Sequence, residues 1–495
     1  MSSYHAIMML FCRLIAILLF ILLLEAESAF STSYYVAPTG RDTNPGSLSF
    51  PWRTITKAAN TLTAGDIVYI ASGTYAERLI PKNSGSNGQF ITFTVQKGAD
   101  VVIDGAAITL PPYDSGLIQI ENRNYIKISG VNVRNAGPNP NNAGIYVDCS
   151  DHIVVENSKT YNTVSSGIGV WNSTNVVIDN NVVERACNDG EQECITVAGT
   201  NGFQIENNHI HHGGPGTLGG EGIDSKDGSS NGKISGNRIH DLNRLGIYIE
   251  AWDKHTHTIE VSKNRVYNCL NDGIALASEM GGLLENIRVI NNIVYNNLHN
   301  GIAITPNGPV TRPPMRNLFI INNTCVGNGD GSVANPWGGG IMVDNPNINA
   351  LVIRNNIFSQ NLLFQILIEV SVAQLSVDHN LINGFRGYNN EIQGSSFVKG
   401  NPFFLNSADG DFHLGSNSPA IDSGYALAAP KDDFDSLKRP QGRAYDLGAF
   451  EYKEQNRVQR HYPRLYSTAE PKHKKIYRNL GLSEGPLSGK LHMVK

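Results

Sequence analysis

The sequence is poor in charge and has no excess of basic residues. Asp, Glu, Lys and Arg make up 17% of its 495 residues, with 39 basic residues against 44 acidic ones. Residues 453–495 hold 10 of the basic and 3 of the acidic residues, so the body that precedes them is acidic. Domains that bind nucleic acids carry a basic surface. The sequence therefore predicts no nucleic-acid partner.

Long apolar runs are also missing, apart from one near the N-terminus. Residues 14–24 are apolar, Arg13 precedes them, and the stretch 25–29 ends in small residues. This pattern is typical of a secretory signal peptide, whereas a membrane-spanning helix needs about 20 apolar residues. We therefore expect residues 1–29 to be a signal peptide, and the mature protein to be secreted, extracellular and not inserted in a membrane.

Cysteine is scarce, with six residues in the chain, and Cys12 lies within the expected signal peptide. The five that remain are an odd number, so they cannot all pair with one another. Cys187 and Cys194 are close enough in sequence to close a small disulfide loop, and the secretory route permits one. Glycosylation sequons begin at Asn172 and Asn322, which predicts a glycoprotein.

The sequence has no long helical pattern and contains a short repeated pattern instead. The pattern apolar–x–apolar–x–x–Asn recurs at intervals of 24 to 33 residues. Its asparagines are Asn181, Asn208, Asn237, Asn264, Asn292, Asn323, Asn356 and Asn380. Each interval also contains a Gly-Ile strand with alternating character, such as 222–226 and 246–250. Repeats of this length bury their apolar faces by stacking on one another.

This spacing suits one turn of a parallel β-helix, and it predicts an all-β, right-handed, single-stranded parallel β-helix over residues 33–452. We expect the recurrent asparagines to occupy tight turns that tolerate left-handed geometry and to form a structural hydrogen-bond ladder between coils. Residues 51–60 resemble a short amphipathic helix that caps the N-terminal end. Residues 418–424 and 446–452 are expected to close the other end, and the basic residues 453–495 to form a disordered tail. We expect a monomer.

With its repeats and both capping segments, the chain resembles the pectate lyase-like superfamily of right-handed parallel β-helix proteins over roughly residues 33–452. That resemblance implies a carbohydrate-active protein with a polysaccharide ligand. It does not fix the reaction, because lyases, hydrolases, uronate epimerases and non-catalytic proteins share this scaffold.

Stacking equivalent strands places acidic residues together on one outward face. Glu193 and Glu221 occupy the same position in successive coils, and Asp224 follows on the same face. Like charges at the spacing of neighbouring strands are destabilising unless something offsets them. Either Lys226 neutralises a solvated acidic face, or the three carboxylates hold a divalent cation. Calcium binds six to eight oxygen ligands, so we expect Ca²⁺ with Glu193, Glu221 and Asp224 as ligands.

Residues 220–231 look like the active-site coil of the alginate lyase and chondroitinase B type of polysaccharide lyase. By that resemblance Glu221 would be a calcium ligand and Lys226 the base. Independently, a lysine beside a cation can serve as a base because the cation lowers its pKa. The resemblance also implies an arginine acid, for which Arg244 is the best match; His255 is a further candidate. Lys254 and His240 are alternatives.

Residues suited to holding sugars surround this cluster. Tyr248, Glu250 and Trp252 lie on the coil after Lys226, and Trp171 lies on the coil before Glu193. The aromatic faces can stack on sugars, although packing under a loop is an equally good explanation for each.

The sequence therefore predicts a secreted lyase that cleaves an acidic, uronic-acid-containing polysaccharide by calcium-assisted β-elimination. The cation would stabilise the charge that develops when the C5 proton leaves. Glycoside hydrolysis, which needs two carboxyl groups about 5–9.5 Å apart, remains an alternative, with Asp224 and either Glu250 or Asp227 as the pair. Uronate C5 epimerisation and non-catalytic carbohydrate binding are the others.

Overall fold

The computed structural model describes residues 31–189, 192–215, 219–331 and 337–454. The expected signal peptide lies outside these residues, as does nearly all of the expected tail. In the part of the chain that is described, no helix is long and apolar enough to cross a membrane.

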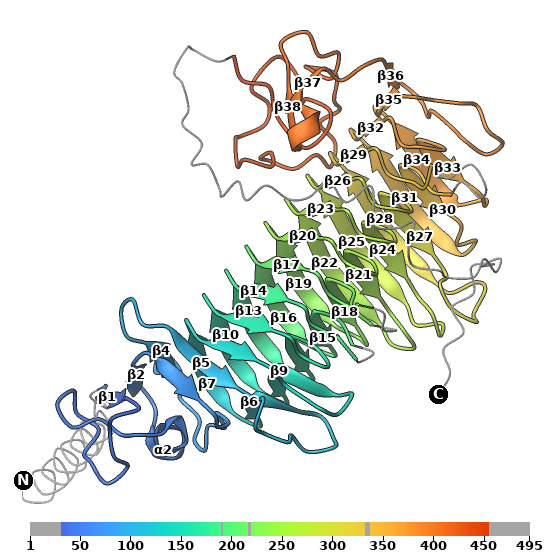
Figure 1. Cartoon of the computed structure of the whole chain (residues 1–495). Helices are drawn as coiled ribbons and strands as arrows, with labels where there is room; N and C mark the ends of the chain where they lie inside the picture. Colours follow the sequence, from blue (N-terminus) through green and yellow to red (C-terminus); the bar gives the residue numbers. More distant parts are fainter. Residues whose placement is uncertain (1–30, 190–191, 216–218, 332–336, 455–495) are drawn as a thin grey trace, which may run out of the picture.

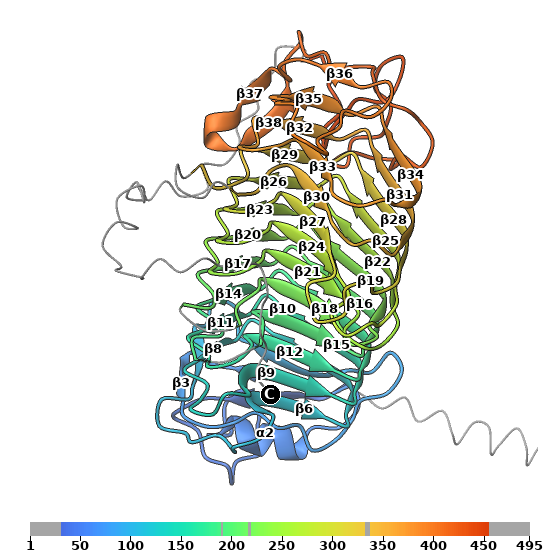
Figure 2. The same cartoon turned by 90° about the vertical axis from the view of Figure 1, so that its right-hand side faces the viewer.

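The described residues wind into a right-handed parallel β-helix, so the predicted fold class is confirmed (Figure 1). Three stacks of parallel strands rise side by side along its length (Figure 2). Every coil contributes one strand to each stack in the central part of the molecule, and a strand pairs with its equivalents one coil before and one coil after.

The first sheet has 13 strands. In spatial order they are β1 (Ser33–Val36), β2 (Ile67–Ile70), β4 (Ile91–Val95), β7 (Asn124–Ser129), β10 (Asp151–Glu156), β13 (Thr174–Asp179), β16 (Asn201–Glu206), β19 (Ser230–Ser235), β22 (Thr256–Ser262), β25 (Leu284–Ile290), β28 (Met315–Ile321), β31 (Ile348–Arg354) and β34 (Ala373–Asp378).

The second sheet also has 13 strands, most of them three residues long. They are β3 (Gly73–Tyr75), β5 (Val101–Asp104), β8 (Asn132–Arg134), β11 (Lys159–Tyr161), β14 (Val182–Glu184), β17 (His209–His211), β20 (Arg238–His240), β23 (Arg265–Tyr267), β26 (Ile293–Tyr295), β29 (Thr324–Val326), β32 (Ile357–Ser359), β35 (Leu381–Asn383) and β36 (Val398–Lys399).

The third sheet has ten strands and carries the acidic cluster. They are β6 (Ser115–Glu121), β9 (Asn142–Asp148), β12 (Ile168–Trp171), β15 (Ile195–Ala198), β18 (Ile223–Lys226), β21 (Ile247–Glu250), β24 (Ile274–Ala277), β27 (Ile302–Thr305), β30 (Ile341–Val343) and β33 (Ile366–Ile368).

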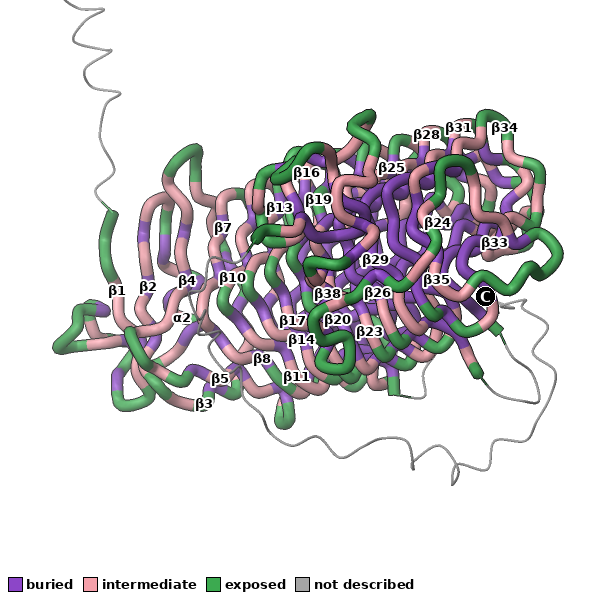
Figure 3. Tube along the Cα trace, turned by 90° about the horizontal axis from the view of Figure 1, so that it is seen from above, coloured by how far each residue is buried: buried purple, intermediate pink, exposed green. Residues whose placement is uncertain are grey.

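Inward-facing aliphatic residues fill the space between the sheets. Ile195, Ile223, Ile247 and Ile274 pair in register on four successive coils, and each is fully buried. Buried residues recur in each coil along the length of the molecule (Figure 3). The alternation of side chains along a strand sends the neighbours of these isoleucines outward, which fixes the positions of the residues on the third sheet's outer face.

The recurrent asparagines form the predicted ladder. From Asn181 to Asn356, the side-chain Nδ2 of each asparagine donates to the side-chain Oδ1 of the next at 2.9–3.0 Å, and the series ends at Asn380. All eight asparagines are buried. The left-handed geometry falls one position earlier than expected, for example at Asn180 (φ 54°) and Asn207 (φ 56°). Left-handed backbone turns the chain there, and the following asparagine points inward to the ladder.

The predicted N-terminal cap is present as helix α2 (Ile55–Thr61). Thr54 begins it by accepting a hydrogen bond from the backbone N–H of Lys57 at 3.0 Å, which satisfies one of the donors that a helix start leaves open. Ile55, Ala58 and Ala59 bury one side of the helix.

The C-terminal segment differs from the expectation of an end cap. Strands β37 (Phe404–Asn406) and β38 (Asp411–Leu414), joined by the 3-10 helix η1 (Ser407–Asp409), lie beside the strands of the second sheet (Figure 1). Residues 446–450 reach the same flank, where Asn322 donates to the carbonyls of Asp446 and Gly448 at 3.0 Å. The segment covers the side of the solenoid because Leu414, Leu447 and other apolar residues pack there. Asn322 is consequently fully buried and cannot carry a glycan in the folded protein.

No disulfide joins the five cysteines among the described residues. Cys187 and Cys194 do meet in the core, where they hydrogen bond to each other as thiols and burial raises the pKa of Cys187 well above its usual value. The predicted proximity is therefore present without the covalent bond.

Candidate functional site

The register of the third sheet places four of the predicted site residues, Asp224, Lys226, Tyr248 and Glu250, on the outward face of its strands. Thr196, Asp224 and Tyr248 are paired on β15, β18 and β21. Two residues further along, Lys226 pairs with Ala198, and Glu250 pairs with Ala277. Because neighbouring strands lie about 4.8 Å apart, the charged groups of adjacent coils come into contact.

Lys226 lies at the centre of the cluster. Its Nζ is 2.7 Å from Oε1 of Glu193 and 3.6 Å from Oδ2 of Asp224. The second oxygen of Glu193 accepts a hydrogen bond from Thr196 Oγ1 at 2.8 Å, and Thr196 in turn contacts Ser166 Oγ at 2.8 Å. Glu193 is thus held on both oxygens, and the structure brings three of the predicted residues together.

Glu221 belongs to a second ion pair next to the first. Oε1 of Glu221 accepts a hydrogen bond from Nε of Arg244 at 2.9 Å and lies at an ion-pair distance of 2.9 Å from Nη2. Arg244 comes from the loop before β21, so it approaches from the following coil. The predicted acid of the reaction is therefore paired with a predicted calcium ligand.

The acidic residues are buried, not spread over an open face as the sequence suggested. Burial raises the pKa of Asp224 well above its usual value, and the neighbouring Glu193 carboxylate adds to the effect. Oδ1 of Asp224 is buried and has no hydrogen-bond partner. Burial also raises the pKa of Glu221, although Arg244 opposes the shift. Transfer of a carboxylate from water favours its neutral form, which explains both directions.

Burial acts against the charge of Lys226, but the carboxylates of Glu193 and Asp224 outweigh it and raise the pKa of Lys226 well above its usual value. The side chain therefore keeps its positive charge while these partners are in place. In this arrangement Lys226 is better suited to neutralising a substrate's charge than to accepting a proton.

Glu250 and Tyr248 extend the cluster toward the following coils. Burial raises the pKa of Glu250 to about 8, despite the opposing charge of Lys226. Tyr248 donates to Oε1 of Glu279 at 2.5 Å and accepts from Nδ2 of Asn307 at 2.7 Å. Burial thus favours the protonated form of the Glu250 carboxyl group, which suits a proton donor.

The predicted calcium ligands do not form a ready cation site in this arrangement. Lys226 holds Glu193, and Arg244 holds Glu221. Across the described ranges, no group of three or more His, Cys, Asp or Glu side chains is placed to hold a metal ion. Oδ1 of Asp224 is buried without a hydrogen-bond partner and could serve as one oxygen ligand. Calcium binding remains a prediction.

The other predicted residues lie at the edge of the cluster or away from it. Trp171, at the end of β12, stacks on Tyr146 with 5.0 Å between ring centroids. The backbone N–H of Trp252 donates to Glu250 at 3.2 Å. His255 forms a hydrogen bond with Glu285 at 3.0 Å, and its ring lies tilted against that of His257 with 4.4 Å between the centroids, so its contacts are with the first sheet.

The two alternative acids also have other contacts. His240 lies on the second sheet, where its Nε2 is 2.7 Å from Nε2 of His209 and its ring stacks on that of Tyr267. The backbone of Lys254 packs closely on Gly282. Residues that sequence reasoning missed are Thr196 and Asn307. Thr196 was already in the outward column of aligned strands, whereas Asn307 lies in a loop whose path no repeat reveals.

Comparison with known proteins agrees with the fold. Residues 34–213 match a family model described as a Pel9A-like, right handed beta helix region, and residues 187–348 match one described as a right handed beta helix region. The chain is 29% identical to the uncharacterized protein YwoF of Bacillus subtilis strain 168 over 283 residues. That match covers 51% of this chain and 59% of the relative, so the chain matches less than two thirds of that protein's length.

Two solved structures have the same architecture. Pectate lyase Pel9A superposes with a TM-score of 0.52 at 15% identity, covering 86% of this chain and 98% of that one. XylC, solved in complex with xylose, gives a TM-score of 0.51 at 14% identity, covering 85% and 98%. At these identities the likeness shows the fold alone. It confirms the predicted resemblance to pectate lyase-like β-helix proteins.

Proposed function

We propose that this right-handed parallel β-helix, which shares its fold with a pectate lyase, is a carbohydrate-active enzyme that cleaves an acidic polysaccharide by β-elimination. The observation that carries the proposal is the buried contact of Lys226 with Glu193 and Asp224, next to Glu250, on the outer face of the third sheet. Clusters of buried ionisable groups with shifted pKa values are typical of active sites.

β-Elimination first needs positive charge near the C6 carboxylate of the substrate, and the cations of the cluster supply it. The C5 proton of a uronic acid is weakly acidic because negative charge develops toward the C6 carboxylate as the proton leaves. Positive groups placed at that carboxylate stabilise this charge. Lys226 and Arg244 are the cations of the site. The raised pKa of Lys226 keeps it charged while Glu193 and Asp224 are its partners, and Arg244 supplies the positive charge in a step in which Lys226 acts as the base.

Proton transfer is the second requirement. Glu250, whose pKa of about 8 keeps it protonated at neutral pH, is suited to protonate the oxygen that leaves from C4. Lys226 as the base that removes the C5 proton is the role predicted from the sequence. That role requires the substrate to draw Glu193 and Asp224 away from Lys226, so that its pKa falls.

A pair of variants separates the two roles of Lys226. Arginine keeps a positive charge but cannot act as a base in a protein. If Lys226 is the base, Lys226→Arg loses as much activity as Lys226→Ala. If Lys226 only neutralises charge, a neighbouring carboxylate such as Glu193 takes the C5 proton, so Lys226→Arg retains a measurable share of kcat and Lys226→Ala does not.

The reaction itself is tested on a panel of uronate polymers: polygalacturonate, alginate and a glycosaminoglycan. Each is incubated with the protein in calcium and in a chelator, and ultraviolet absorbance reports the unsaturated uronide that elimination creates. Activity that survives the chelator would refute the calcium prediction. Absence of absorbance on every polymer, with binding or new reducing ends in its place, would refute elimination.

Hydrolysis is the second candidate, and two buried carboxyl groups favour it. Asp224 and Glu250 lie on the neighbouring strands β18 and β21, and both have raised pKa values. Hydrolases use one carboxyl group as acid and another as base or nucleophile. The solved complex of XylC with xylose shows that a protein of this fold binds a neutral sugar. New reducing ends without ultraviolet absorbance would identify hydrolysis.

We also propose that the protein is secreted after removal of residues 1–29 and acts as a monomer. N-terminal sequencing of protein recovered from the medium tests the first statement, and light scattering tests the second.

A further inference from the structure

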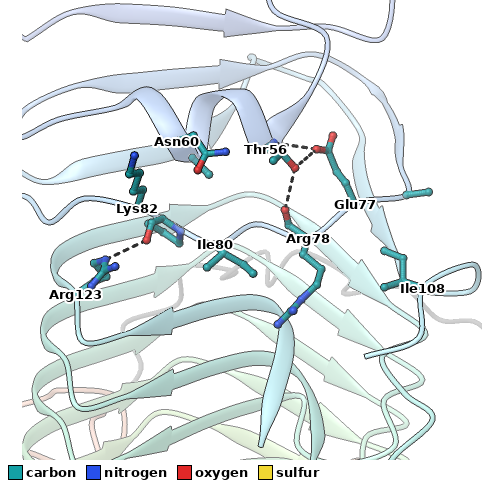
Figure 4. A pocket seen from close by; sticks show the side chains of 11 residues that line it. Thr56, Asn60, Glu77, Arg78, Ile80, Lys82, Ile108 and Arg123 are labelled. Carbon is teal, nitrogen blue, oxygen red and sulfur yellow. Dashed lines mark hydrogen bonds between the residues drawn. The ribbon is translucent and has the colours of Figure 1, made fainter. Parts of the chain in front are cut away.

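A cavity of about 650 Å³ lies between helix α2 and the first coils, far from Lys226. Figure 4 shows its lining, with helix α2 along one side and the chain from Glu77 to Lys82 along the other. Three basic side chains line it: Arg78, Lys82 and Arg123.

This cavity shares a sheet face with the candidate active site. Leu79 forms a parallel bridge to Ile118 of β6, its N–H donates to Leu117 at 2.9 Å, and its carbonyl accepts from Gln119 at 2.9 Å. Residues 78–80 therefore add one more rung to the third sheet, next to β6. In register, this rung lies five strand spacings from β18, which is about 24 Å at 4.8 Å per spacing.

The three basic groups have no acidic partner within the described residues. Arg78 donates to the carbonyl of Gly116 at 3.0 Å and to the side chain of Gln119. Arg123 donates to the carbonyls of Pro81 at 3.2 Å and Asn122 at 2.8 Å. The ion pairs of the described chain include neither arginine, nor the exposed Lys82.

Glu77, the carboxylate that lines the cavity, is engaged elsewhere. It accepts the backbone N–H groups of Ile55 and Thr56 at 2.9 Å and the Thr56 hydroxyl at 2.6 Å, where helix α2 begins (Figure 4). Its charge is thereby compensated by the open donors of the helix start. The residues that line the cavity have a net positive charge, with three basic groups against the single carboxylate of Glu77, which fits an anionic ligand.

Apolar side chains next to the basic residues restrict the chemical class of ligand that fits the cavity. Ile80 is 43% exposed and lines the cavity together with Ile108. Sugar acids offer carboxylates along their edge and C–H groups on their faces, so a mixture of cations and apolar side chains fits them. Between the cavity and Lys226, the same sheet carries the stacked rings of Tyr146 and Trp171.

We propose that the cavity is a remote subsite that holds carboxylates of the same acidic polysaccharide, about five coils from the reacting sugar. A polymer lying along the third sheet passes over Trp171 and reaches Arg78, Lys82 and Arg123. This inference rests on the proposed function only in the choice of an acidic polymer as the ligand. It predicts that long chains bind more tightly than short oligosaccharides that cannot span the distance.

The test measures binding separately from turnover. A triple variant carries Arg78→Gln, Lys82→Gln and Arg123→Gln, and a second variant carries Lys82→Gln alone, because that exposed side chain can be changed without disturbing the fold. Retention in gels containing polygalacturonate, alginate or neutral xylan gives the affinity for each polymer. Turnover of uronate trisaccharides reports the reacting site alone.

A matched control removes the same charge elsewhere. Arg41, Lys97 and Arg316 are exposed basic residues outside the cavity, and all three are changed to Gln. We expect the triple variant to bind a uronate polymer about tenfold more weakly than this control, which corresponds to about 1.4 kcal/mol. Lys82→Gln alone gives a smaller loss in the same direction, and added salt reduces both.

Two results would overturn the inference. One is equal retention of the triple variant and the control on uronate polymers, and the other is a wild-type protein that no uronate polymer retains. Either can occur whether or not the unsaturated product forms, so a failure of the subsite is distinguished from a failure of the proposed reaction.

Discussion

Replacing Lys226 by Met tests the electrostatics of the cluster directly. The change removes the charge that lies 2.7 Å from Glu193 and 3.6 Å from Asp224, whose side chains are 6% and 2% exposed. At an effective dielectric constant of about 20, contacts at these distances correspond to about 6 and about 5 kcal/mol before the cost of desolvation. Breaking a buried ion pair by removing one partner typically costs about 3–5 kcal/mol, and we expect that loss of unfolding free energy for Lys226→Met near pH 8.

The size of the loss depends on pH. Protonation relieves the uncompensated carboxylates, and the pKa of Asp224 is already raised. Removing Lys226 raises it further, so the variant's deficit shrinks as the pH falls and the carboxyl groups take up protons. Denaturant titrations of wild type and variant at several pH values measure this trend.

Lys233→Met is the matched control. Lys233 lies 2.8 Å from Glu206, but the lysine side chain is 49% exposed. Pairs of this kind contribute about 0–1 kcal/mol. A Lys226→Met variant that loses no more stability than Lys233→Met, or whose deficit does not depend on pH, would refute the reasoning.

Three further predictions concern the scaffold. Asn264→Ala should lower the free energy of unfolding by several kcal/mol in denaturant titrations, since each buried polar group left unsatisfied costs about 1–3 kcal/mol. Asn380→Ala, at the end of the ladder, should lower it by less. Equal losses for the two variants would argue against a ladder. Ile247→Ala should lower the unfolding free energy by about 2–5 kcal/mol by leaving a cavity, and a loss under about 1 kcal/mol would contradict its fully buried position. Burial lowers the pKa of His209 to about 4 and of His211 to about 3. Unfolded chains therefore bind protons at a higher pH than folded ones, and the melting temperature should fall as the pH drops from about 6.5 toward about 4. The double variant with Gln at both positions should show a smaller fall, and a pH profile identical to that of the wild type would show that these histidines are not the cause.

The repeat made the fold predictable. The asparagine ladder depends on the spacing of one residue type and on strand stacking, both of which are visible in the sequence. The strand register also follows from the repeat, so Asp224, Lys226 and Glu250 could be placed on one face of the sheet from the sequence alone. Strand pairing is local in a solenoid, since each coil contacts its neighbours.

Burial and partner choice could not be predicted in the same way. The sequence placed Glu193 and Glu221 beside each other, but it could not show that Lys226 would hold one and Arg244 the other. Arg244 reaches Glu221 from a loop, and loop paths depend on packing that the repeat does not encode. The position of residues 446–450 on the flank was missed for the same reason, because the contact of Asn322 with Asp446 spans 124 residues.

That flank contact has a consequence for how the chain assembles. Coils can form one after another as the chain emerges, because each strand pairs with the coil before it. The outer surface around Ile293 and Ile357 is different, since it is covered by Phe450 and Leu447. Arg439, in a fully buried pair with Glu451, also reaches back to Asn291. The coils around β26 and β32 therefore expose apolar surface during synthesis until this later segment arrives, and an interrupted chain would leave that surface open to other molecules.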